Sequence, residues 1–440
     1  MKVGFISLGC AKNQVNCEQM IWKTYEAGYE VALGAEDCDV AVVNTCGFLQ
    51  EAREEALAEI DALAQAKAQG KLQKILVTGC MAQWWKDEIQ ARCPQADGFV
   101  GVSGYEDIAQ VIAQALEDQH PAHFGDIDAP VPETDRVVCT SDHWAWLRIA
   151  EGCDNRCAYC IIPFIRGKFR SRPEEAILAE ARDLAQAGMK ELIVVAQDIT
   201  RYGLDLYGER TLAKLLPKLC AIEGIHWIRL HYLYPDEITD ELIDVIANEP
   251  KIVKYLDIPI QHISDRMLKA MHRRGTGGEI RALFAKLRKA MPDVVLRTSL
   301  ICGLPGEGEA EFEELCQFLR EEKLQRAGVF QFSPEEGTLA AAMDGQVDPD
   351  TAQRRVELVV DLQSRVMDEY NEQRLGTVME VLCEGFDSQA GCYVGRTYAD
   401  SVEIDGHVYF TAAGLVPAGS FVNVRITGTM DGDLTGEIDE

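Results

Sequence analysis

The sequence lacks a long hydrophobic run, which excludes a membrane-spanning helix. No apolar stretch approaches the roughly 18 residues needed to cross a bilayer. The first nine residues read as a β-strand, without the small-residue cleavage site of a signal peptide. The fifteen cysteines favour metal binding in a reducing compartment over disulfides. We therefore expect a cytoplasmic protein with no membrane partner.

Positive charge is also scarce. The chain has 43 Lys and Arg against 72 Asp and Glu, a net charge of −29. Such a chain repels phosphate backbones at long range and attracts basic partners, although solubility or adaptation to salt explains the charge equally well. The charge alone therefore disfavours a nucleic-acid substrate but leaves room for a local basic patch.

A fourth cysteine is missing beside the densest cysteine motif. Cys153, Cys157 and Cys160 form a C-x3-C-x2-C run after the apolar stretch 144–150 and a Glu151-Gly152 turn. Soft thiolates suit iron–sulfur clusters, and three of them leave one iron of a 4Fe–4S cube open to a chelating ligand. An open iron indicates a reaction centre more than a passive electron carrier. The alternative is a zinc site with His143 as the fourth ligand.

Three further cysteines occupy equivalent places in residues 1–138. Each directly follows a short β-rich run and precedes a helical pattern: Cys10, Cys46 and Cys80, followed by helices expected over 13–27, 49–69 and 82–92. This alternation predicts a doubly wound parallel sheet, whose carboxyl edge gathers ligands. The fold would thus bring the three cysteines together as a second cluster site. The alternative is that they are buried packing residues, as we expect for Cys17, Cys38 and Cys93.

Residues 139–370 carry six strand signals that alternate with helices, and residues 118–138 look like a linker. Six units predict a partial (β/α)6 barrel rather than a closed barrel of eight. Polar residues at the carboxyl ends of these strands are candidates for cofactor or substrate contact: Gln197, Asp198, His231, Gln261, His262 and the run Gly303–Glu307. Polar strand ends are common, and the glycine run is equally consistent with a plain turn. Arg166 can serve an anion or a surface ion pair.

Residues 371–440 show short strand patterns separated by glycines, at 377–382, 401–404 and 421–426. Closely spaced short strands predict a small antiparallel β-barrel. From Arg374 onward there are three basic and eleven acidic residues. A module so acidic is poorly suited to gripping phosphates and favours a basic protein surface.

Taken together, the chain resembles the radical S-adenosylmethionine (SAM) methylthiotransferases over nearly its whole length. The motifs that carry the resemblance are Ser7–Cys10, Asn44–Gly47, Thr78–Cys80 and Cys153–Cys160. Tyr255–Arg266 and Phe332–Thr338 resemble the RimO branch, which modifies an aspartate of ribosomal protein uS12, more than the MiaB branch, which modifies tRNA adenosine. One departure is Ala11, where RimO-like chains commonly have proline.

The resemblance implies an N-terminal methylthiotransferase domain (1–138), a radical SAM core (139–370) and a TRAM-like β-barrel (371–440). It implies that Cys153, Cys157 and Cys160 hold the cluster that binds SAM, and that Cys10, Cys46 and Cys80 hold an auxiliary cluster that carries the transferred sulfur. One SAM would supply the methyl group and another the radical that abstracts hydrogen from the aspartate β-carbon. We further expect the following residues to contribute: Tyr159, Gln197, Asp198, Gly303 and Glu307 for cofactor, and His231, Gln261 and His262 for substrate.

The expected partners are uS12 and an electron donor such as a flavodoxin or a ferredoxin, with nucleic acid not the substrate. A tRNA methylthiotransferase and a non-catalytic iron–sulfur scaffold are the alternatives.

Overall fold

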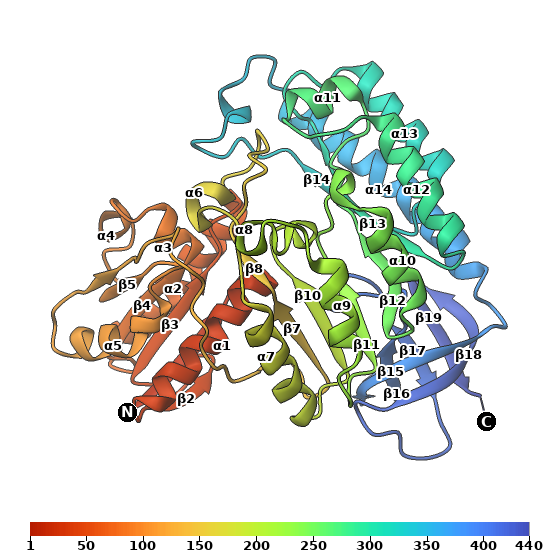
Figure 1. Ribbon diagram of the computed structural model, residues 1–440. Coiled ribbons are helices and arrows are strands. Elements are labelled where there is room, and N and C mark those ends of the chain that lie inside the picture. The colour runs from red at the N-terminus through yellow and green to blue at the C-terminus, as the bar shows by residue number, and fades with distance from the viewer. Residues whose placement is uncertain (440) are drawn as a thin grey trace.

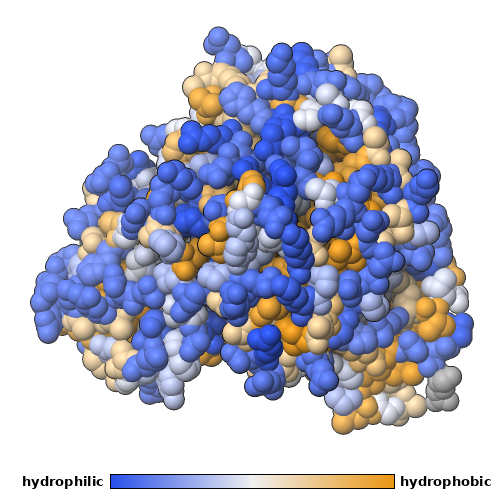
Figure 2. Space-filling view, viewed as in Figure 1, coloured by the Kyte–Doolittle hydropathy of each residue, from blue (hydrophilic) through white to orange (hydrophobic). Residues whose placement is uncertain are grey.

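The structure is a computed structural model and describes residues 1–439. Figure 1 shows three units in chain order, from the N-terminal sheet through a central sheet to a C-terminal barrel. Hydrophilic residues cover most of the face seen in Figure 2, with apolar residues in smaller patches. Among residues 1–439, no helix is both long enough and apolar enough to cross a membrane.

The N-terminal unit is a six-stranded parallel sheet in the order β2-β1-β3-β4-β5-β6. Its strands are β1 (Lys2–Ser7), β2 (Glu30–Leu33), β3 (Val40–Thr45), β4 (Lys74–Gly79), β5 (Gly98–Val100) and β6 (Ala122–His123). Helices are α1 (Ala11–Glu26), α2 (Gln50–Ala68), α3 (Cys80–Trp84), α4 (Ile89–Arg92) and α5 (Ile108–Leu116), the last preceded by the 3₁₀ turn η1 (Tyr105–Asp107). Every residue of β3 is buried, which explains the apolar run over residues 40–43.

Two expectations for this unit need correction. The helix expected over 82–92 is two short helices, α3 and α4, because the chain turns between Trp85 and Glu88. The expected linker 118–138 contains strand β6, whose backbone pairs with β5 and extends the sheet. Short edge strands carry little apolar signal, so such a strand is easily read as a loop.

The central unit is an open parallel sheet of six strands, ordered β14-β13-β12-β11-β10-β7. These are β7 (Trp144–Arg148), β10 (Glu191–Val195), β11 (Trp227–Leu230), β12 (Ile252–Asp257), β13 (Val295–Cys302) and β14 (Arg326–Gln331). The main helices are α7 (Glu174–Gln186), α9 (Leu212–Cys220), α10 (Asp240–Asn248), α12 (Gly277–Ala290), α13 (Glu309–Glu322) and α14 (Pro349–Glu372). All six expected strands are present.

Shorter elements decorate the loops of this unit: β8 (Ala150–Glu151), β9 (Arg170–Ser171), α6 (Ile162–Arg166), α8 (Leu204–Tyr207), α11 (Asp265–Ala270), η2 (Ile199–Arg201), η3 (Pro235–Glu237) and η4 (Ala340–Ala342). Alternate residues of each main strand face the helices and form one apolar core, with Leu192, Leu230 and Leu296 fully buried in it. The opposite face of the sheet carries charged residues such as Glu191, Arg229 and Arg297.

The C-terminal unit is a closed barrel, ordered β15-β16-β17-β19-β18. Its strands are β15 (Val378–Asp387), β16 (Cys392–Arg396), β17 (Val408–Thr411), β18 (Phe421–Met430) and β19 (Asp433–Ile438). The barrel is antiparallel except for β17 and β19, which pair in parallel. The strand expected at 401–404 is a turn, with Glu403 at φ 63°.

That turn belongs to a segment, residues 397–405, that we call the plug loop because it fills the charged face of the central sheet. Asp400 accepts a hydrogen bond from Arg326 (2.7 Å), and Asp405 accepts one from the Tyr255 hydroxyl (2.6 Å). Arg229 donates to the carbonyls of Thr397 and Tyr398. The C-terminal unit thus packs on the charged face of the central sheet through the plug loop.

Candidate active site

The carboxyl edge of the N-terminal sheet brings three cysteines together. Cys10 precedes α1, Cys46 follows β3 and Cys80 begins α3 directly after β4. Strands β1, β3 and β4 are neighbours in the sheet, so their ends meet. The packing is close: a Cβ added to Gly9 would lie 2.9 Å from the Cys46 Cβ, and one added to Gly47 would lie 2.7 Å from the Cys80 carbonyl carbon. Only glycine at positions 9 and 47 leaves room for the three cysteine-bearing turns to pack this closely against one another.

The three thiols differ in their electrostatic surroundings. Desolvation would raise the pKa of Cys10, but Lys12 and Arg166 outweigh it and lower the pKa. Burial raises the pKa of Cys80 to about 11, although Arg166 opposes this by donating a hydrogen bond to its Sγ (3.3 Å). Cations next to these sulfurs favour thiolates, the form that binds metal.

The second trio lies on the loop after β8. Cys153 begins it, and Gly152 turns the chain at φ +81°, where a Cβ would meet the Lys168 carbonyl oxygen at 2.0 Å. Cys157 Sγ lies 3.7 Å from the Tyr234 hydroxyl and 3.8 Å from Arg273 Nη1. Arg273 also stacks over the Tyr234 ring, 4.1 Å from its centroid. Burial raises the pKa of Cys153 to about 12, so metal ligation is needed to hold it as a thiolate at neutral pH.

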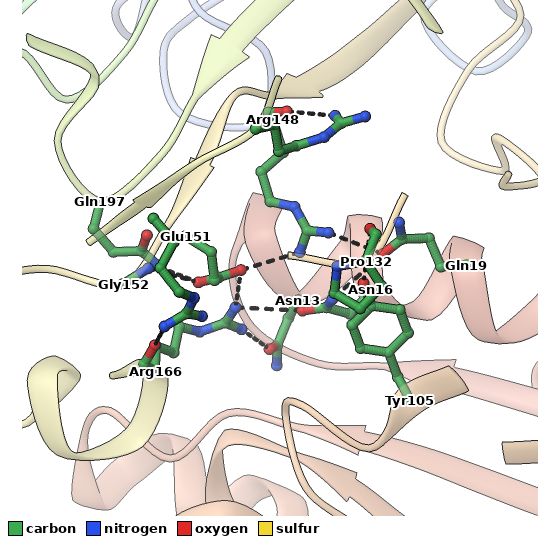
Figure 3. Close-up of polar contacts among 12 residues, drawn as sticks. Asn13, Asn16, Gln19, Tyr105, Pro132, Arg148, Glu151, Gly152, Arg166 and Gln197 are labelled. Carbon is green, nitrogen blue, oxygen red and sulfur yellow. Dashed lines mark hydrogen bonds and ion pairs between the residues drawn. The ribbon is translucent and has the colours of Figure 1, made fainter. Parts of the chain in front are cut away.

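A buried polar network links helix α1 of the N-terminal unit to Glu151, which lies two residues before Cys153 (Figure 3). Glu151 Oε2 accepts hydrogen bonds from Arg148 (3.0 Å) and Arg166 (2.9 Å). The other nitrogen of the Arg166 fork reaches Asn13 (2.6 Å) and Cys80, which both belong to the N-terminal unit. Burial would raise the pKa of Glu151, but the two guanidinium groups lower it to about 2. Glu151 is therefore a carboxylate that fixes Arg166 beside Cys80.

Gln197 and Asp198, expected at the end of β10, both contact the surroundings of the second trio. Gln197 donates to Glu151 Oε1 (2.7 Å) and so extends the network of Figure 3. Asp198 accepts from the Asn155 side chain (2.9 Å) and from the Thr200 backbone (3.1 Å), and burial raises its pKa. Through Asn155, Asp198 holds the loop that carries Cys153 and Cys157.

Gly303, Glu307 and His262 meet at the ends of β12 and β13. Glu307 accepts hydrogen bonds from the Gly303 backbone (3.1 Å) and Arg355 (2.8 Å), and lies 3.6 Å from His262 Nε2. His262 Nδ1 accepts from the backbone of Ile263 and Ser264. A Cβ on Gly303 would lie 2.4 Å from the Ala352 Cβ of α14, so helix packing already requires this glycine. Their contact with SAM or substrate stays a prediction.

The three remaining expected residues have distinct environments. Tyr159 is partly buried against an apolar cluster that includes Met267, Leu304 and Phe332. Gln261, four residues beyond the end of β12, has a left-handed φ of 70°. His231 is 1% exposed, and its Nε2 lies 2.8 Å from Ser401 Oγ of the plug loop. In this arrangement the plug loop, rather than an open space, occupies that side of His231.

Several residues of the site escaped the sequence interpretation. Lys12 is two positions from Cys10, and Arg273 and Tyr234 flank Cys157, yet none stands at a strand end in an obvious motif. Lys12 could have been found from the sequence, because a basic residue close to an expected metal ligand is unusual in so acidic a chain. For Arg273, 113 positions beyond Cys160 in the chain, only the tertiary structure reveals the contact.

The zinc alternative is not supported by the geometry. His143 lies at the start of β7, opposite the cysteine loop, where it contacts Ser141 and, at 3.9 Å, Glu384 of the barrel. Within residues 1–439, no group of three or more His, Cys, Asp or Glu side chains is arranged to hold one metal ion. Zinc ligands share a single ion at about 2.3 Å, whereas cluster ligands bind separate irons and stand further apart. That each set of three cysteines holds an iron–sulfur cube with an open iron stays a prediction.

Comparison with solved structures shows the fold. The chain resembles the radical SAM methyltransferase TsrM from Kitasatospora setae, solved with cobalamin and a [4Fe-4S] cluster, with a TM-score of 0.57 at 12% identity over 86% of this chain and 80% of that chain. It also resembles the cobalamin-dependent SAM radical enzyme OxsB, with a TM-score of 0.53 at 14% identity over 84% and 56%. Family models match the Radical SAM superfamily over residues 147–319, the Uncharacterized protein family UPF0004 over 2–101 and the TRAM domain over 375–438.

These matches and the two cysteine trios define the class: the chain is a radical SAM enzyme. A relative in Acetivibrio thermocellus named ribosomal protein uS12 methylthiotransferase RimO is 46% identical over 99% of this chain and 98% of its own length. Its namesake in Pelotomaculum thermopropionicum is 46% identical over 99% of each chain. The chain belongs to the RimO family of methylthiotransferases, which use SAM and two 4Fe–4S clusters. The expected family, fold class, enzyme class and cofactors are confirmed.

Proposed function

We propose that this chain attaches a methylthio group to the β-carbon of an aspartate in ribosomal protein uS12. The observation that carries the proposal is the pair of cysteine trios, one at the edge of the N-terminal sheet and one on the loop after β8, in a chain that is 43–46% identical to eight relatives named for this activity. A methylthiotransferase needs a radical generator and a sulfur carrier close together, and the two trios supply a place for each.

We assign Cys153, Cys157 and Cys160 to the cluster that binds SAM, and Cys10, Cys46 and Cys80 to the auxiliary cluster. With these groups bound, the site can cleave a C–H bond by hydrogen-atom abstraction and replace it with a C–S bond. The protein's own residues orient the groups: Asp198 braces the first cysteine loop through Asn155, and Arg166 holds Cys80 against Glu151. Their burial keeps water from the reacting atoms.

The acidic barrel supports a basic protein as the partner. Of its three basic residues from Arg374 onward, Arg396 is fully buried between Glu191 and Glu384, and Arg425 pairs with Asp439. The barrel therefore offers little positive charge to RNA phosphates. We further propose a cytoplasmic location, a one-electron donor such as a flavodoxin or a ferredoxin, and domain boundaries at 138/139 and 370/371.

The decisive experiment incubates the anaerobically reconstituted enzyme with SAM and dithionite, in parallel with purified uS12 and with tRNA. We expect a gain of about 46 Da on one aspartate of uS12, since CH3S replaces H, and no change in tRNA. Modified tRNA with unmodified uS12 would instead establish the tRNA adenosine activity. Release of neither 5′-deoxyadenosine nor methionine would indicate a non-catalytic scaffold.

A further inference from the structure

Lys12 is a buried cation without an acidic partner. It lies in the first turn of α1, and the residue is only 7% exposed to solvent. Its Nζ lies 3.7 Å from the centroid of the Tyr232 ring. Within residues 1–439, no Asp or Glu oxygen lies within ion-pairing distance of this Nζ, although the chain has 72 acidic residues. A buried charge is costly unless it is paired, and apart from the Cys10 thiol two residues away no acidic side chain of the described residues pairs with Lys12, so the position suits a carboxylate from outside the chain.

Lys12 contacts residues from both the N-terminal unit and the central unit. Cys10, two residues before it, is one of the proposed ligands of the auxiliary cluster. Tyr232 belongs to the other side, just beyond the carboxyl end of β11. Lys12 therefore lies where the N-terminal sheet edge faces the strand ends of the central sheet.

Tyr232 is held in an unfavourable conformation there. Its φ is 64°, a left-handed value that a bulky residue rarely adopts. Two backbone hydrogen bonds maintain it: its N–H donates to Asp257 Oδ2 (3.2 Å), and its carbonyl accepts from Ile199 (3.1 Å). Strain of this kind concentrates at functional sites, where the surrounding structure enforces it. Here the strain places the partly exposed ring against the Lys12 ammonium.

We propose that Lys12 binds the side-chain carboxylate of the substrate aspartate, with the Tyr232 ring holding the ammonium in place. The inference rests on the proposed function, because that function makes an aspartate the substrate. The β-carbon of an aspartate is bonded directly to its carboxylate carbon. A carboxylate bound at Lys12 therefore sets the reacting carbon beside the Cys10 site and distinguishes aspartate from asparagine, which carries no charge.

The test compares binding of two forms of uS12, the natural protein and a variant with the modified aspartate changed to asparagine. Equilibrium binding is measured by fluorescence anisotropy with cluster-loaded enzyme and no reductant, so that no turnover occurs. Wild-type enzyme should prefer the aspartate form by roughly tenfold to a hundredfold, the range of a charge-assisted hydrogen bond. Lys12→Met should abolish that preference while leaving affinity for the asparagine form unchanged, and Lys12→Arg should keep most of it.

Lys23→Met is the matched control, because Lys23 lies on the same helix and pairs with Glu26 at the surface. It should behave like wild type. The proposal is overturned if Lys12→Met retains the aspartate preference, if wild type shows none, or if Lys12→Met lowers only the iron content or the affinity for SAM. The asparagine variant of uS12 tests the wild-type enzyme directly and does not depend on the folding of any enzyme variant. Failure of methylthiolation of intact uS12, measured separately, would count against the proposed function instead.

Discussion

At the scale of single residues, the site is organised by cations placed beside sulfurs. Arg166 reaches Cys80, Arg273 reaches Cys157, and Lys12 and Arg166 lower the pKa of Cys10. In a chain with a net charge of −29, these local cations reverse the overall field where thiolates are needed. The six cysteines therefore have unequal surroundings, and their roles can be separated by substitution.

Replacing Cys10 with alanine removes one proposed ligand of the auxiliary cluster and leaves the other trio intact. We expect thiolation to be lost while cleavage of SAM to 5′-deoxyadenosine continues. The iron content should fall from about eight to about four per chain, because one cube is lost. Cys17→Ala, at a cysteine buried inside α1, is the control and should keep both clusters. Thiolation by the Cys10 variant would show that the second cluster is not the sulfur source.

At the scale of elements, the plug loop makes the C-terminal barrel part of the core's stability. Glu191 of β10 is fully buried between Arg229 and Arg396, and the plug loop adds the contacts to Arg326, Tyr255 and His231. If the barrel moved away, each of these groups would lose its partner and would be left buried without one or exposed to water, which costs free energy. The barrel is thus packed rigidly against the central sheet and is not a mobile domain on a flexible linker.

This packing predicts a dependence of stability on pH. Burial lowers the pKa of His231 to about 3. Asp257 opposes this shift, while the nearby cations Arg229, Arg297 and Lys12 add to it. The unfolded chain takes up this proton near pH 6.5, so the free energy of unfolding should fall as pH drops below 6.5. The expected loss at pH 5 is about 2 kcal/mol. Urea unfolding at pH 7 and pH 5 measures it.

His231→Gln should flatten this pH dependence, because glutamine does not titrate. His120→Gln, at an exposed position, should leave it unchanged. An equal slope in wild type and His231→Gln would mean that other groups cause the acid sensitivity.

At the scale of the whole molecule, the strong negative charge should govern how the enzyme meets a basic substrate. Long-range attraction raises association rates and is screened by salt, whose screening length is about 8 Å at 0.15 M ionic strength. We expect the association rate with uS12 to fall roughly tenfold or more between low and high salt, with a smaller change in the dissociation rate. Stopped-flow measurements across a salt series test this. An association rate that does not change with salt would mean that the negative charge serves solubility and not substrate attraction.

Much of this architecture was predictable from the sequence because its signals are local. Buried parallel strands read as apolar runs, and each proposed ligand of the auxiliary cluster follows such a run directly. The class of sheet and the meeting of Cys10, Cys46 and Cys80 at one edge follow from that pattern and from the rule that parallel strands end together. The same reasoning failed for β6 and for the turn at 401–404, where short segments take their conformation from what they pack against.

The sequence by itself determined the three-part α/β architecture, the family and the positions of six cysteines at the ends of predicted strands or on one loop. Only the tertiary structure decided that Arg166 links Glu151 to Cys80, that the plug loop packs on the central sheet, and that no Asp or Glu pairs with Lys12. The physical reason is the range of the interactions. Strand, helix and loop preferences depend on residues close together in the chain, whereas buried charges can pair across long separations, as Glu191 and Arg396 do across 205 positions.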